Sequence, residues 1–441
     1  MDRLLGGRKS VAKWLRKFWL VWSWTAEWGV IQKLTFDSRI DYALILPAFL
    51  LNLIGLLVLY IATSHDYPSR LAKVMTQQIT WGIAGVIVAL IVMHFDAKML
   101  WKFTPILYGL GIVLMILPLK FYDPLTVALT GAKNWVYLGG SNLFQPSEFM
   151  KISYILLMAR VVVSFQNRLK KRLLKDDILL ILFMFLVTVP VMVLLAAQKD
   201  FGTALVFMAI FAGIVVVSGV SWRLILPVVI IVALLGGGVI YLTTFDAGRE
   251  FLKSVGMDNY QILRIDAWRD PFANAQGSTY QQAQGLLAIG TGGLFGKGFN
   301  VANISVPVRE SDMIFTVIGE NFGFLGSAFV ILLYFILIYR MIRVTIRANN
   351  QFYIYVSTGI TMMILFHVFE NIGANIGVLP LTGIPLPFIS QGGSSLIGNL
   401  IGIGLVLSMK YNQEPNFPIE HIKKRSSSPR DYRTDKLSHN K

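Results

Sequence analysis

Apolar runs of about 20 residues recur along almost the whole chain, separated by shorter polar stretches. A run of that length is what an α-helix needs to cross the hydrocarbon core of a bilayer. The pattern predicts an all-α, polytopic membrane protein with about ten transmembrane helices. The predicted spans are Ile40–Thr63, Val74–Phe95, Met99–Lys120, Phe144–Phe165, Ile178–Ala197, Phe201–Gly219, Leu224–Phe245, Met313–Tyr339, Gln351–Asn375 and Gln391–Met409.

Three segments between these runs are longer or richer in glycine and proline than ordinary connections: Phe121–Leu143, Asp246–Asp312 and Ile376–Ser390. The second is far too long for a simple turn, and its aromatic and glycine-rich composition predicts an ordered loop. The third contains three prolines in an apolar stretch. Such a sequence predicts non-helical backbone that is buried in protein or lines a cavity.

Composition agrees with the membrane class. Of 441 residues, 55% are hydrophobic and 15% charged, and the mean hydropathy is +0.62. A soluble chain would be about a quarter charged. The absence of Cys excludes disulfides and thiolate chemistry.

The excess of basic residues gives the topology. Lys and Arg number 40 against 24 Asp and Glu, a difference of 16. The excess lies in the two terminal arms and in short loops such as Gln166–Asp177, which is typical of cytoplasmic segments. A nucleic-acid role would need a folded basic face, and none is visible. We therefore expect a cell-membrane protein with both termini cytoplasmic and the three long segments outside.

The same pattern divides the chain into three parts. Residues 1–39 form a basic arm that holds five of the ten Trp, and residues 40–409 form the transmembrane domain, with 246–312 as its large extracytoplasmic loop. We expect the arm to lie on the inner leaflet as a helix, the alternative being a disordered arm. Residues 410–441 are a basic tail that we expect to be disordered and that could bind anionic membrane lipid.

Asp312 is the first candidate for chemistry, because a carboxylate at the end of a membrane helix is costly unless it has a function. We expect Ser311 to cap the helix and place Asp312 in its first turn. The helix dipole and Arg309 would then favour the ionised form, which suits a base or a metal ligand. The alternative is an acid that only caps the helix.

Other polar groups offer a substrate site or a purely structural role. Glu148 and Lys151 share a helix face and form either a charged cavity wall or a buried structural pair. Glycines near Lys297, with Arg264 and Arg269, could cradle a phosphate, although ordinary tight turns explain them equally well. Two further groups are expected to be structural: Asp200 as a helix cap, and His367, Glu370, Asn371 and Asn375 as interhelical hydrogen-bonding residues on one face.

Several motifs, taken in order, resemble the SEDS family, the family of RodA, FtsW and SpoVE. They read GAKNW, QPSEFMK, YQQAQGLLAIGTGGLFGKG, VPVRESDMIFTVIGENFGFLG and NIGANIGVLPLTGIPLPFISQGGSS, and the match covers about Ile40 to Met409. Details such as PVRESDMIF and HVFENIGA look most like the RodA branch found in streptococci. Lys199, Phe201 and Asn134 depart from the family pattern, so Asp200 and Asn134 receive no transferred role.

The resemblance implies a ten-helix fold and peptidoglycan glycosyltransferase activity on lipid II during cell elongation. It implies a class B penicillin-binding protein as partner, with elongation-complex proteins such as MreC and MreD. The essential acid carries onto Asp312, and the QPSE…K pair onto Glu148 and Lys151. Further expected substrate-binding residues are Arg264, Arg269, Gln281, Lys297, Arg309, Thr382, Ser394 and Ser395. No cofactor is certain; a divalent cation (Mg or Mn) could assist, and no metal ligands are assigned.

The expected mechanism makes Asp312 a general base that takes the proton from the 4-hydroxyl of an acceptor GlcNAc. The oxygen attacks the anomeric carbon of the donor MurNAc, and undecaprenyl diphosphate leaves with inversion. Cationic groups that stabilise the diphosphate matter more here than a protein acid. The alternative function is a flippase that moves lipid II outward, and a scaffold without chemistry ranks last.

Overall fold

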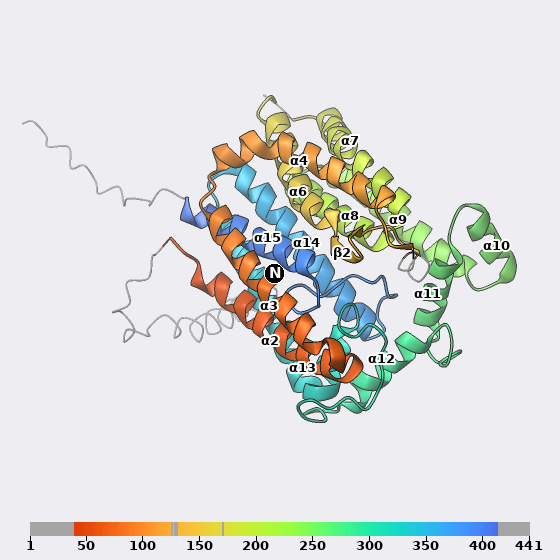
Figure 1. Cartoon of the computed structure of the whole chain (residues 1–441). Helices are drawn as coiled ribbons and strands as arrows, with labels where there is room; N and C mark the ends of the chain where they lie inside the picture. The colour runs from red at the N-terminus through yellow and green to blue at the C-terminus, as the bar shows by residue number, and fades with distance from the viewer. Residues whose placement is uncertain (1–38, 125–126, 128–130, 170–171, 413–441) are drawn as a thin grey trace, which may run out of the picture. The chain divides into compact units, whose positions relative to one another are not determined.

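The computed structural model describes residues 39–124, 127, 131–169 and 172–412. Within them, a long helix occupies each of the ten predicted apolar runs (Figure 1). The helices are α2 (Tyr42–Asp66), α3 (Leu71–Met93), α4 (Ala97–Lys120), α6 (Pro146–Gln166), α7 (Leu174–Gln198), α8 (Phe201–Val217), α9 (Trp222–Leu242), α13 (Ile314–Arg347), α14 (Gln351–Asn375) and α15 (Gly393–Tyr411). The predictions for the N-terminal arm and for the tail after Asn412 lie outside the described residues.

Among the described residues, eight of these helices are long and apolar enough to cross a membrane. The other two differ for physical reasons. Helix α8 has 17 residues and is short for a span. Helix α6 carries Glu148, Lys151 and Arg160, yet 14 of its 21 residues are buried. Its charges therefore lie in protein and not in lipid.

Helix α6 is central because it contacts α4, α7, α8, α14 and α15. Helix α15 packs along α3, and α13 packs against both α2 and α14 (Figure 1). Most residues of α14 and α15 are buried, and their apolar side chains belong to one large core cluster. By contrast, α9 has no buried residue.

Helix α13 is broken near its start. Gly323 has φ 62° and ψ −156°, outside the helical region. A Cβ on Gly323 would lie 2.3 Å from the backbone nitrogen of Gly296, so only glycine fits there. The peptide groups on each side of the break instead form hydrogen bonds with the glycine-rich loop, residues 290–298. One example is Phe324 N, which donates to Gly293 O at 2.9 Å.

The described residues of the three long connecting segments adopt defined conformations. The first holds a hairpin of β1 (Val136–Leu138) and β2 (Ser141–Phe144), which the all-α prediction missed. Its turn residues Gly139 and Gly140 have φ of 60° and 83°, as a two-residue hairpin turn requires. The second, predicted as an ordered loop, contains the helices α10 (Asp246–Ser254), α11 (Asn259–Arg269) and α12 (Tyr280–Thr291). A 3-10 turn, η2 (Pro68–Arg70), joins α2 to α3.

The third segment confirms the prediction from its prolines. Between α14 and α15 the chain is not helical, yet Leu381, Ile384 and Ile389 are buried. Its backbone finds partners in protein: Leu386 N donates to Ser390 Oγ at 2.9 Å. We call residues 376–392 the buried segment.

Candidate functional site

Asp312 lies just before α13, and its backbone is fixed from the side of α14. The predicted cap by Ser311 is wrong, because α13 begins at Ile314 and has no side-chain cap. Instead, the side-chain amides of Asn371 and Asn375 each donate to the Asp312 carbonyl at 2.8 Å. Two aligned donors on one oxygen hold the peptide in a single position.

The two preceding carbonyls are held by the buried segment. Ser390 Oγ donates to Ser311 O at 2.6 Å, and the backbone N–H of Gln391 donates to Glu310 O at 2.9 Å. Three successive carbonyl groups are therefore tied to neighbouring elements. This network, and not a helix cap, positions the carboxyl group of Asp312.

The Asp312 carboxyl group is buried, with 8% of the residue exposed, and its Oδ1 has no hydrogen-bond partner. Burial raises the pKa of Asp312 from 3.8 to about 6, and the charge of Arg264 opposes that rise. The expectation that the helix dipole and Arg309 shift this group toward its ionised form is therefore wrong, because its pKa is raised and not lowered. Arg309 is itself engaged, because its guanidinium forms a bidentate pair with Asp66 at 2.6 and 2.7 Å.

Arg264 is the cation whose charge lowers the pKa of this carboxyl group. Helix α11 brings it from the long loop, and its guanidinium lies 4.3 Å from the ring centre of Tyr260 and bonds that hydroxyl. A Cβ on Gly383 would lie 3.6 Å from Arg264 Nη2 and 3.8 Å from Asp312 Oδ2. Gly383, with φ 82°, thus leaves open the point at which Arg264 and Asp312 approach each other.

A polar cavity of about 120 Å³ adjoins Asp312. Asp312 is not among its lining residues, but its neighbours Ser311 and Gly383 are. Of the predicted substrate-binding residues, it is lined by Glu148, Lys151, Thr382 and Ser395. Its remaining polar lining is Asn134, Gln145, Asp200, Thr203, His367 and Gln391.

Glu148 and Lys151 form the predicted ion pair, with Lys151 Nζ 2.8 Å from Glu148 Oε2. Lys151 Nζ is also 3.0 Å from His367 Nε2. An ammonium group can only donate, so Nε2 accepts and the ring proton lies on Nδ1, 2.6 Å from Met363 O. Both side chains are buried, and both line the cavity. They therefore form a buried ion pair and a charged cavity wall at once, the two roles that the sequence left open.

Asp200 has the capping role that the sequence predicts, since its Oδ1 accepts from Thr203 N at 3.1 Å at the start of α8. Its Oδ2 also accepts from Asn134 Nδ2 at 2.9 Å and from Gln145 Nε2 at 3.2 Å. These three polar residues therefore form one wall of the cavity.

Helix α14 contributes site residues that the sequence reasoning classed as structural. His367 contacts Lys151, the Glu370 carboxylate accepts from the Thr382 hydroxyl, and Asn371 holds the Asp312 carbonyl. The available signal was a polar stripe at positions i, i+3, i+4 and i+8 of a membrane helix. Such a stripe indicates a functional interior as well as helix contacts.

The glycine-rich loop packs against α13. Lys297 Nζ pairs with Glu320 at 3.0 Å, and the backbone N–H groups of Lys297 and Gly298 donate to carbonyl groups of α13. These donors are therefore used at the break in α13.

Three other predicted substrate residues are not among the residues that line the cavity. Gln281 donates to Pro307 O at 3.2 Å, and Ser394 Oγ accepts from Gln145 N at 3.1 Å. Arg269 is exposed at the end of α11 and, five residues after Arg264, projects about 140° away from it around the helix.

The described part of the chain contains no group of three or more His, Cys, Asp or Glu side chains placed to hold a metal ion.

Comparison with known proteins identifies the family. A model of the FtsW, RodA and SpoVE cell cycle proteins matches residues 42–414. The peptidoglycan glycosyltransferase MrdB of Escherichia coli K12 is 32% identical over 368 residues, which cover 82% of this chain and 92% of MrdB. The peptidoglycan glycosyltransferase RodA of Treponema pallidum is 26% identical over 439 residues, covering 85% and 98%.

Solved structures agree. A chain from a peptidoglycan synthase complex that coordinates polymerization and crosslinking has a TM-score of 0.67 and 26% identity, covering 85% of this chain and 99% of that one. The rod shape determining protein RodA of Thermus thermophilus has a TM-score of 0.58 and 26% identity, covering 84% and 96%. The chain therefore belongs to the FtsW/RodA/SpoVE family of cell cycle proteins, which is the SEDS family that its motifs resemble.

Proposed function

We propose that this protein is a peptidoglycan glycosyltransferase that polymerises lipid II, with Asp312 as the general base. The observation that carries the proposal is the buried Asp312 carboxyl group, whose Oδ1 has no partner, beside Arg264 and a polar cavity. Burying a carboxylate without a partner is costly, so such a group marks a functional site. The activity named for MrdB and for RodA of Treponema pallidum supports this assignment.

The pKa of Asp312 suits the proposed step. A carboxyl group with a pKa of about 6 is mostly ionised at neutral pH, yet it is a stronger base than an exposed aspartate. It would take the proton of the acceptor 4-hydroxyl as that oxygen bonds to the anomeric carbon of the donor. The bond from that carbon to the diphosphate breaks, and undecaprenyl diphosphate leaves with the electron pair.

Positive charge stabilises the leaving diphosphate, and the structure reduces the number of cationic side chains that could supply it. Arg264 approaches Asp312 at Gly383, and Lys151 lines the cavity. Arg309 and Lys297, which the sequence also suggested, are occupied by Asp66 and Glu320. Lys151 is likewise paired, with Glu148, and contacts His367. We therefore assign stabilisation of the diphosphate to Arg264. The divalent cation remains a prediction of the sequence, and we assign it no step.

The proposal extends to topology and partners. The distribution of Lys and Arg supports cytoplasmic termini and a site at the extracytoplasmic face. A class B penicillin-binding protein is the proposed partner, supported by the likeness to a chain of a synthase complex. A role in cell elongation, with MreC and MreD as further partners, is proposed from the resemblance to the RodA branch. For the terminal arms we propose the contacts with the inner leaflet and with anionic lipid that their composition predicts.

A polymerisation assay in detergent separates this function from the flippase. Detergent micelles have no second leaflet, so a protein that only moves lipid II across a membrane yields no product there. We expect the purified full chain, with its partner penicillin-binding protein, to convert labelled lipid II into glycan polymer. If no polymer forms while labelled lipid II crosses vesicle membranes that contain the protein, the flippase is the correct function.

A further inference from the structure

Glu370 is a buried carboxyl group that has no part in the step assigned to Asp312. It lies on α14 with 3% of the residue exposed, and its Oε1 accepts a hydrogen bond from the Thr382 hydroxyl. Thr382 lines the polar cavity beside Asp312. Removing a carboxylate from water costs free energy that a hydroxyl donor offsets only in part. The charge of Glu370 therefore depends on the charged groups around it.

The buried segment brings Glu370 close to Asp312. Thr382, which bonds Glu370, is followed directly by Gly383. A Cβ on Gly383 would lie 3.8 Å from Asp312 Oδ2 and 3.6 Å from Arg264 Nη2. One side of this turn therefore contacts Glu370, and the other faces the point where Asp312 and Arg264 approach each other.

The next residue of α14 fixes the same arrangement. Asn371 Nδ2 donates at 2.8 Å both to the Asp312 carbonyl and to the Ile384 carbonyl of the buried segment. Two successive residues of α14, Glu370 and Asn371, therefore hold the chain on either side of the Asp312 carboxyl group. The distance between the two acids is set by these contacts and not by flexible side chains alone.

Arg264 is shared between the two carboxyl groups. Its charge acts on both Asp312 and Glu370, and the charge of Asp312 also acts on Glu370. If both acids are ionised, one guanidinium faces two carboxylates, and one negative charge among these three groups is left unbalanced. Glu310, two residues before Asp312, adds a further like charge. Two carboxyl groups in one buried site avoid this repulsion when they hold one proton in common.

Charged and titratable groups of other elements that pack against α14 are engaged elsewhere. They come from α6, from α13 and from the start of α8. The contacts are those of Lys151 with Glu148 and His367, of Lys297 with Glu320, and of Asp200 with Thr203. Arg264 is therefore the cation through which Asp312 and Glu370 are coupled.

We propose that Glu370 and Asp312 share one proton beside Arg264, so that the charge of Glu370 sets the strength of Asp312 as a base. The inference rests on the proposed function, and Glu370 is a positioning residue because it acts through Asp312. The step requires an ionised Asp312, so the shared proton then lies on Glu370. When Asp312 accepts the proton of the acceptor hydroxyl, the repulsion that kept Glu370 protonated is removed.

The test is a double-mutant cycle in the thermal unfolding of the purified full chain in detergent, at pH 8.5 and pH 5. Asp312→Asn and Glu370→Gln are made singly and together. At pH 8.5 the shared proton is lost, so each single substitution relieves the same repulsion. We expect the rise in Tm from Asp312→Asn to be about half as large in the Glu370→Gln background. At pH 5 the rise should be the same in both backgrounds.

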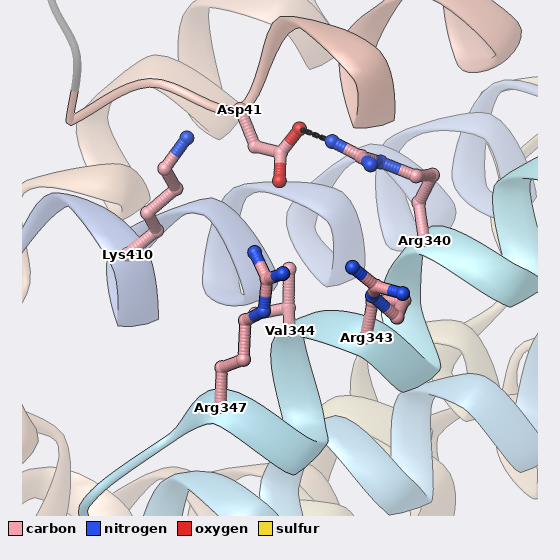
Figure 2. A pocket seen from close by; sticks show the side chains of 6 residues that line it. All are labelled: Asp41, Arg340, Arg343, Val344, Arg347 and Lys410. Atoms are coloured by element: carbon pink, nitrogen blue, oxygen red, sulfur yellow. Dashed lines mark hydrogen bonds and ion pairs between the residues drawn. The ribbon is translucent and has the colours of Figure 1, made fainter. Parts of the chain in front are cut away.

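Asp41→Asn is the matched control for loss of a buried carboxylate. Asp41 is 8% exposed and pairs with Arg340 at 2.9 Å in a second cavity (Figure 2). Arg340 lies in the last turns of α13, whereas Asp312 precedes its first residue. The effects of Asp41→Asn and Asp312→Asn on Tm should therefore add at both pH values.

A second pair of variants replaces Glu370→Gln if that protein does not fold. Thr382→Val removes the hydroxyl that donates to Glu370 and so favours its neutral form, whereas Thr382→Ser keeps the hydroxyl. At pH 8.5 the rise in Tm from Asp312→Asn should fall in the Thr382→Val background and should stay at its wild-type size in the Thr382→Ser background.

The pH dependence of polymerisation gives a second readout. The rate should reach half its maximum near pH 6 in wild type, and about one pH unit lower in Glu370→Gln, because a like charge beside Asp312 is removed. Additive effects on Tm at pH 8.5, or an unchanged midpoint in Glu370→Gln, would overturn the proposal. Absence of polymer from wild type would instead refute the proposed function, and the cycle would still decide whether the two acids share a proton.

Discussion

Asp312→Asn should make the folded protein more stable at neutral pH. Burial raises the pKa of this group from 3.8 to about 6. Each pKa unit corresponds to 1.36 kcal/mol, so the ionised carboxyl group costs the folded state about 3 kcal/mol at neutral pH. The asparagine side chain has no charge to bury and avoids this cost.

The sign of the pH dependence follows from the same shift. The folded state binds the Asp312 proton more tightly than the unfolded chain does. The contribution of this group to stability is therefore fully present below its unfolded pKa of 3.8 and lost as the pH rises through about 6. The gain in stability of Asp312→Asn over wild type should be largest at neutral pH and should disappear by about pH 4.

Thermal unfolding of the purified full chain in detergent, over a series of pH values, measures this difference. Asp258→Asn is the matched control, because the Asp258 side chain is 49% exposed and pairs with Lys199 at the surface. That variant should differ little from wild type at any pH. A Tm for Asp312→Asn equal to or below that of wild type at neutral pH would refute the argument, as would an advantage independent of pH.

Three further predictions concern the surroundings of Asp312. Lys151→Met leaves the buried Glu148 carboxylate unpaired and should lower stability by about 3–5 kcal/mol. The double variant Glu148→Gln/Lys151→Met should recover the Tm but not polymerisation. A normal rate of polymerisation in the double variant would make the pair purely structural. Gly323→Ala should lower the Tm because the new Cβ would clash with backbone atoms of the glycine-rich loop. Gly109→Ala is the control and should not lower the Tm, because no atom lies within 4 Å of its new Cβ. Equal Tm values for the two variants would contradict the tight contact at the break in α13. Asn371→Leu removes the buried amide that donates to the Asp312 and Ile384 carbonyls. It should lower the Tm and lower the rate of polymerisation by the remaining folded protein about 10- to 100-fold, whereas an unchanged rate would remove its positioning role.

The sequence predicts the helices well because length and hydropathy dominate in a membrane. Each of the ten apolar runs contains a long helix, and the proline-rich stretch before α15 is non-helical and buried, as expected. The β1–β2 hairpin was missed although Gly139 and Gly140 are a turn signal. That signal lay in a short polar stretch whose flanking residues do not alternate clearly.

The site was harder to predict because its contacts join distant parts of the chain. Lys297 and Arg309 look like free cations in the sequence, but Glu320 and Asp66 neutralise them, and Asp66 is 243 positions from Arg309. The role of Asn371 depends on where the buried segment brings Asp312. Spacing within one helix places such a residue on a face, but it does not identify the group that this face meets.

The most direct test of the proposed chemistry is the single-turnover rate of lipid II polymerisation by Asp312→Asn. The Asp312→Asn chain with the proposed penicillin-binding protein partner is compared with the same complex carrying Asp258→Asn. Loss of a general base predicts a rate about 10²- to 10⁴-fold below wild type, with the control unchanged. A rate for Asp312→Asn within a few fold of wild type would contradict the assignment of Asp312 as the base.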